Sequence, residues 1–86
     1  MTLDPLRRRI DRIDLQLLRL LNRRAAAVLK IGELKKKHRL PVYDSRREQE
    51  ILRRMAEENP GPLPSASVKA IFGEILRRNR SLQSRN

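Results

Sequence analysis

The spacing of apolar residues between Pro5 and Lys37 limits what this chain can fold into more than any other feature. Apolar and small residues recur there in alternating steps of four and three, at Leu6, Ile10, Ile13, Leu17, Leu20, Ala27, Ile31 and Leu34. This a/d seam predicts one long helix that packs against another helix. It would be roughly 50 Å long, whereas a compact domain of this size is about 25–30 Å across. One chain cannot cover such a helix, so the seam predicts a partner chain.

Two shorter helices are expected after the long one. The second begins near Asp44 or Ser45, either of which can cap it, and stops before the turn at residues 59–62. The third runs from about Pro64 to about Leu82 and carries an apolar stripe in four-three steps. No alternation typical of strands and no internal repeat is present, so the fold class is all-α. The length fits one domain, residues 1–86.

Composition narrows the class of protein. The apolar fraction is only 38%, which favours an oligomer because a small monomer buries little of its surface. The net charge of +11 favours anionic partners. Nucleic acid is one such partner, but Tyr43 and Phe72 are the only aromatic residues, so no stacking platform for single strands exists. Arginines on the predicted outer faces are expected to be solvated, namely Arg8, Arg12, Arg19, Arg53 and Arg54.

The chain contains no cysteine, which excludes disulfides and suits the cytoplasm. No apolar run approaches the roughly 20 residues that span a bilayer, so no membrane partner is expected. The first residues contain no apolar stretch of the kind found in signal peptides.

Polar residues stand on or beside the apolar stripes of all three helices. Arg24 fills the missing seam position, Arg7 and Lys35 share the heptad column that flanks the seam, and Asn79 interrupts the third stripe. Three further residues lie four positions from a stripe residue: Arg47, Glu48 and Gln83. Each of these residues taken alone can be explained by a structural role, as part of an ion pair, as a helix cap or as a solvated residue at the edge of the apolar stripe. Together, four cations and several neutral donors suit a small ligand with two carboxylates.

The familiar catalytic arrangements are missing. His38 is the only histidine and lies in a basic connector, and no phosphate loop or metal-ligand spacing is present. An enzyme built from these residues would therefore work by positioning and electrostatics, without nucleophile, metal or cofactor.

From Leu3 to Gln83 the chain resembles the all-helical chorismate mutases. The resemblance rests on residues 6–14, 17–24, 31–35, 41–48 and 71–75, all in the family's order and spacing. It implies an intertwined all-α homodimer with two active sites, which converts chorismate to prephenate without a cofactor. Asn59-Pro60-Gly61-Pro62 and the region after it look like mutase domains fused to the first enzyme of the shikimate pathway, so such a synthase is an expected fusion or partner.

The same resemblance implies roles for the polar residues. Arg7 would reach into the partner's site, while Arg24 and Arg47 would hold the substrate carboxylates. Lys35 and Gln83 would donate to the ether oxygen whose bond breaks. Asp44 and Glu48 would lie near the substrate hydroxyl, and Asn79 stands where many relatives have serine.

Three alternative functions stay open at this point. An isochorismate-pyruvate lyase shares the fold and much of the site. A non-catalytic regulatory module would bind prephenate or chorismate and control a partner enzyme. A basic helical dimer that binds nucleic acid is the third and the least favoured, and it predicts DNA affinity that falls steeply with salt. We therefore expect no nucleic-acid partner.

Overall fold

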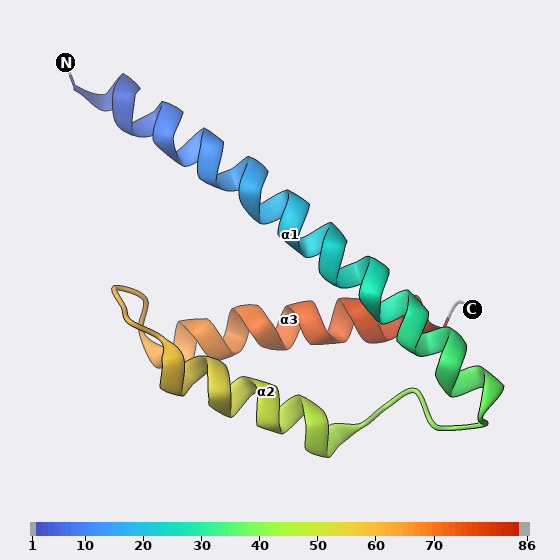
Figure 1. The fold of residues 1–86 in the computed structure, drawn as a ribbon. Helices are drawn as coiled ribbons and strands as arrows, with labels where there is room; N and C mark the ends of the chain where they lie inside the picture. The colour runs from blue at the N-terminus through green and yellow to red at the C-terminus, as the bar shows by residue number, and fades with distance from the viewer. Residues whose placement is uncertain (1, 85–86) are drawn as a thin grey trace.

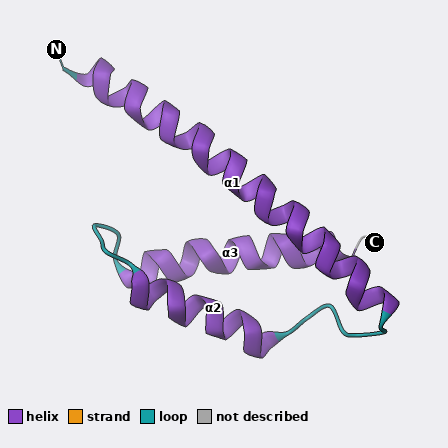
Figure 2. Cartoon of the chain, viewed as in Figure 1, coloured by secondary structure: helices purple, strands orange, loops and turns teal. Residues whose placement is uncertain are grey.

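The computed structural model describes residues 2–84, and three helices account for most of them (Figure 1). Helix α1 spans Leu3–Lys37, α2 spans Ser45–Glu58 and α3 spans Ser65–Ser84. No strand occurs in this described part of the chain, and Figure 2 shows only helices joined by loops. The predicted all-α fold with a very long first helix is therefore confirmed.

Helices α2 and α3 form a hairpin, and α3 packs against the C-terminal half of α1 (Figure 1). The N-terminal half of α1 projects beyond this hairpin, so the molecule measures 58 × 24 × 15 Å. At about 1.5 Å per residue, α1 alone accounts for most of the long dimension. This elongated shape agrees with the length expected from the seam.

Local hydrogen bonds explain where the helices stop and start. At the end of α1, the amide of Leu40 donates to the carbonyl of Lys35 over 2.7 Å, and that of Arg39 donates to Lys36 over 3.2 Å. This pair of bonds is a Schellman motif, which requires a left-handed residue, and Arg39 takes that place with φ of 56°. The side chain of Asp44 caps α2 by accepting from the amide of Arg47 over 3.0 Å.

The turn between α2 and α3 is braced by one side chain. The amide nitrogen of Asn59 donates to the carbonyl of Leu63 over 2.7 Å, and its oxygen accepts from the amide of Gly61 over 3.0 Å. Gly61 has φ of 78°, a conformation that favours glycine. The turn predicted at residues 59–62 is therefore confirmed.

Helix α1 packs on its own chain with a face that is not the a/d seam. Ala25, Val28 and Lys35 are half-buried and Gly32 is buried, and these residues share one face at steps of three and four. By contrast, the seam residues Leu20, Ile31 and Leu34 remain 56%, 47% and 57% exposed. The apolar seam is therefore left without a cover within one chain.

The remaining core is small. Val68 and Leu76 on α3 are the only buried large apolar residues in the described part of the chain. The arginines expected to be solvated are all exposed. Among residues 2–84, no helix is both long and apolar enough to cross a membrane.

Candidate active site

A cavity of about 270 Å³ lies between the C-terminal half of α1, the start of α2 and the end of α3. Every predicted site residue except Arg7 lines it, together with an apolar wall. Its lining consists of Arg24, Val28, Ile31, Lys35, Val42, Asp44, Arg47, Glu48, Ile51, Leu76, Asn79, Arg80 and Gln83. Residues from opposite ends of the sequence thus meet in one place, as the polar pattern predicted.

Arg24 and Asn79 contact each other across the helices α1 and α3. The guanidinium of Arg24 donates to the side-chain oxygen of Asn79, and both residues are half-buried. Asn79 therefore fixes one edge of the guanidinium, while the remaining N–H groups of Arg24 stay available to a carboxylate. A charged group on the apolar seam thus has the polar partner that its burial requires.

Lys35 and Gln83 are held by backbone carbonyls at the same wall of the cavity. The ammonium of Lys35 donates to the carbonyl of Val42 over 3.0 Å, and the side-chain amide of Gln83 donates to the carbonyl of Val28 over 3.2 Å. An ammonium has three donors and an amide NH₂ has two. Each group is therefore oriented by one bond and keeps at least one hydrogen for a ligand.

The position of Gln83 depends on the absence of a side chain at Gly32. A Cβ placed on Gly32 would lie 3.2 Å from the Cγ of Gln83 and 3.5 Å from its Cα. Gly32 is also the only buried residue of α1. The absence of a side chain at Gly32 therefore lets Gln83 lie close against α1.

The edge of the cavity formed by α2 is more open. Asp44 and Arg47 are both exposed, and Arg47 pairs with Glu50 over 3.5 Å one turn along the helix. An exposed pair of this kind contributes little stability, so Arg47 is free to turn toward a ligand. The Asp44 side chain serves as the α2 cap. The sequence predicted Asp44 both as a possible helix cap and as a site residue, and this bond shows the first of these roles.

Sequence reasoning missed one charged residue of the site, Arg80. It lines the cavity from α3, pairs with Glu48 over 3.7 Å and lies 4.2 Å above the ring of Tyr43. Its sequence position holds a usable indication, because it comes four residues after the buried Leu76 and directly after Asn79. A cation there is placed to face the cavity rather than solvent.

Arg7 stands apart from this cavity. It is exposed and lies 28 residues before Lys35 on the same helix, which corresponds to roughly 42 Å along α1. It therefore cannot contribute to the site of its own chain.

The charged groups of the cavity favour an anion. Arg24, Lys35, Arg47 and Arg80 bring four positive charges against the two carboxylates of Asp44 and Glu48. This excess of two matches a ligand that carries two carboxylates. Within residues 2–84, no cluster of three or more acidic or histidine side chains is arranged to hold a metal ion.

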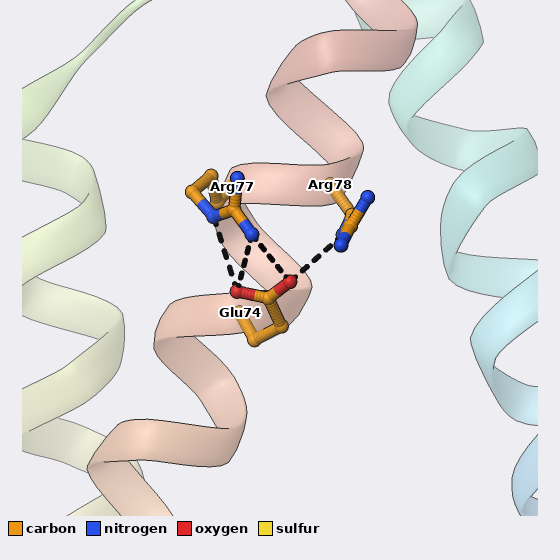
Figure 3. Close-up of polar contacts among 3 residues, drawn as sticks. All are labelled: Glu74, Arg77 and Arg78. Atoms are coloured by element: carbon orange, nitrogen blue, oxygen red, sulfur yellow. Dashed lines mark hydrogen bonds and ion pairs between the residues drawn. The ribbon is translucent and has the colours of Figure 1, made fainter.

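A second cavity of about 500 Å³ lies between the projecting half of α1 and α3. Its lining is mostly apolar and consists of Leu17, Leu21, Ile71, Glu74, Ile75, Arg78 and Asn79. Glu74 accepts hydrogen bonds from Arg77 and Arg78, as Figure 3 shows. These bonds lower the pKa of the Glu74 carboxyl below its ordinary value of 4.5. Asn79 lines both cavities, so the two are neighbours.

Comparisons with known proteins identify the family of this chain. A profile of the family described as chorismate mutase type II matches residues 6–84. A bifunctional chorismate mutase/prephenate dehydratase of Neisseria gonorrhoeae is 47% identical over 72 residues, which cover 84% of this chain. The chain spans between 19% and 24% of the length of the curated relatives it matches.

Solved structures extend the likeness to the whole fold. Chorismate mutase (form II) from Thermus thermophilus is 37% identical, with a TM-score of 0.97 over 100% of this chain and 98% of that one. Chorismate mutase from Helicobacter pylori, solved in complex with prephenate, is 32% identical, with a TM-score of 0.88 over 96% of this chain and 90% of that one.

Proposed function

The chain belongs to the chorismate mutase type II family, and from this premise we propose that it rearranges chorismate to prephenate. The reaction needs no cofactor, and the site that performs it is completed by a second copy of the chain. One observation carries the proposal: the first cavity gathers two oriented donors, an excess of two positive charges and an apolar wall.

These groups suit the chemistry of the rearrangement. Chorismate has two carboxylates, a ring hydroxyl and an ether oxygen, and the reaction breaks the ether C–O bond while a C–C bond forms. Arg24 and Arg47 hold the carboxylates and fold the flexible dianion into its reactive conformation. Partial negative charge develops on the ether oxygen, where Lys35 and Gln83 donate. Donors already oriented there stabilise the transition state more than the substrate.

Product analysis tests this reaction against the related lyase. Purified protein is incubated separately with chorismate and with isochorismate, and the products are identified by chromatography and mass. We expect prephenate from chorismate and no pyruvate from isochorismate, with activity unchanged by a metal chelator. Release of pyruvate from isochorismate without prephenate formation would instead identify a lyase.

We further propose that two chains pair through α1. The uncovered seam and the apolar second cavity supply the contact surface. If two α1 helices cross antiparallel near Leu21, midway between Arg7 and Lys35 in sequence, each Arg7 arrives beside the other chain's cavity. Leu21 is 42% exposed and lines the second cavity, so it is open to such a contact. Sedimentation that shows a compact, active monomer at micromolar concentration would refute the pairing.

Mixed dimers give a sharper test of the shared site. Arg7→Ala and Arg24→Ala should each abolish turnover as pure dimers, because each removes one arginine from both sites. In a mixed dimer, one site carries both changes and the other carries neither. Random mixing of the two variants should therefore restore about a quarter of the wild-type activity, as two-fold symmetry requires. No recovery after confirmed subunit exchange would show that Arg7 does not complete the site of the partner chain.

The context of the domain remains a prediction. We propose that residues 1–86 form one mutase domain. The curated relatives join such a domain to a prephenate dehydratase. The expected link to the first enzyme of the shikimate pathway and the expected cytoplasmic location both stay predictions. The link to the shikimate-pathway enzyme is tested by measuring the activity of that enzyme with and without this domain.

A further inference from the structure

We propose that Arg80 is a positioning residue that holds the carboxylate of Glu48 toward the ring hydroxyl of the substrate. The inference rests on the proposed mutase function and adds a residue that the resemblance did not nominate. Arg80 acts through Glu48, so it affects the reaction without touching the atoms that react.

The ion pair between Arg80 and Glu48 differs from the other ion pairs described. It joins α3 to α2, with side chains only 30% and 21% exposed. The others lie within one helix, between residues three or four apart, and their side chains are at least half exposed: Arg47 with Glu50, Arg53 with Glu57, and Glu74 with Arg77 and Arg78. A half-buried pair that ties two helices together orients its members far more than an exposed pair on one helix does.

A third element contacts the guanidinium of Arg80. Tyr43, in the connector between α1 and α2, places its ring 4.2 Å beneath Arg80. A cation over the face of a ring is attracted to it, and this contact restrains the guanidinium. The carboxylate of Glu48 lies 3.7 Å from Nε of the same guanidinium. Arg80 therefore connects the connector, α2 and α3 at the rim of the cavity.

This arrangement determines what Glu48 can do. A carboxylate with a cationic neighbour accepts hydrogen bonds and does not donate, so Glu48 is set to accept from a hydroxyl. The ring hydroxyl is the group of chorismate that donates in this way. Without Arg80, the carboxylate would lose its orientation toward that hydroxyl, and the hydrogen bond between the two groups would weaken.

The experiment compares Arg80→Gln, Arg80→Lys, Glu48→Gln and the double variant Arg80→Gln/Glu48→Gln. Each is measured with chorismate and with the analogue in which hydrogen replaces the ring hydroxyl. We expect Arg80→Gln to lower kcat/KM for chorismate about tenfold and to leave the analogue within about twofold, a difference typical of one lost charge-assisted bond. Arg80→Lys should recover part of the loss. The control Arg53→Gln removes an exposed arginine from α2 and should leave kcat/KM unchanged for both substrates.

The double variant separates positioning from an independent role. If Arg80 acts through Glu48, the double variant should be no slower with chorismate than Glu48→Gln alone. Equal losses with both substrates, or additive losses in the double variant, would overturn the proposal and would place Arg80 on a substrate carboxylate or in the fold. Should Arg80→Gln not fold by circular dichroism, Arg80→Lys carries the same comparison of substrates. An inactive wild type would refute the proposed function, whereas an active wild type without this coupling would refute only the role of Arg80.

Discussion

Replacement of Gly32 by alanine should change the free energy of unfolding little while lowering the rate of turnover. In the middle of a helix, alanine is more favourable than glycine by about 0.8–1 kcal/mol. The added Cβ would lie 3.2 Å from the Cγ of Gln83, closer than the roughly 3.5–4.0 Å of a comfortable carbon contact. Gln83 must therefore move by a few tenths of an ångström. An off-rotamer side chain costs about 0.5–1.5 kcal/mol, so the free energy of unfolding should change by less than about 1 kcal/mol.

Turnover should respond differently from stability. The amide of Gln83 is oriented by its bond to the carbonyl of Val28, on the same face of α1 as Gly32. Movement of Gln83 weakens that bond and displaces the donor from the ether oxygen. Loss of a whole donor of this kind costs about 10²–10³ in kcat, so partial displacement should cost roughly tenfold. KM should change little, because the interaction strengthens in the transition state.

The matched control is Gly73→Ala. Gly73 is also in a helix interior, on α3, but a Cβ there would meet nothing within 4 Å. This variant should gain about 1 kcal/mol of stability and keep the wild-type kcat. Urea denaturation and steady-state kinetics are measured for both variants. If Gly32→Ala were as fast as wild type, Gln83 would not be the donor to the ether oxygen.

Four further changes test other parts of the structure. Arg24→Ala should leave a folded protein with kcat/KM lowered at least a hundredfold, whereas Arg53→Ala should change kcat/KM little. Similar kinetics for the two variants would contradict the assignment of Arg24 to the active site. Gln83→Glu should be active only when the new carboxyl is protonated, so its rate should rise as pH falls. A rate that equals wild type and does not depend on pH would exclude Gln83 from the chemistry. Because two arginines lower the pKa of Glu74, its ionised form stabilises the fold above the unfolded pKa, and this contribution disappears as pH falls through the lower, folded pKa. The melting temperature of Glu74→Gln should therefore be lower than that of wild type at pH 7 and equal to it at acidic pH. A difference that stays constant with pH would contradict a stabilising role of the ionised Glu74 carboxylate. Arg39→Gly should raise the stability by about 1 kcal/mol without changing kcat, since Arg39 has a positive φ, and a loss of stability would show that its side chain matters more than its backbone.

The sequence by itself determined the helices of this protein and singled out seven of the polar residues that line the first cavity. Helix ends follow from local chemistry: Asp44 caps α2, and the run of cations before Pro41 marks the end of α1. Periodicity and capping act between residues three or four apart, so they can be read without knowledge of the fold. The polar residues could be singled out for a related reason, because a charge on an apolar stripe needs a partner wherever the stripe packs.

Only the tertiary structure decided which face of α1 meets its own chain. The seam is the more apolar face, yet the neighbouring column of Ala25, Val28, Gly32 and Lys35 is the one that is buried or half-buried within the chain. Periodicity marks faces that need cover but does not say which partner covers which face, because that depends on how distant helices are brought together by the connectors. The contacts of Arg80 with Glu48 and Tyr43, and of Gln83 with Gly32, were hidden for the same reason. Each joins residues far apart in sequence, and their distances are fixed by packing rather than by spacing.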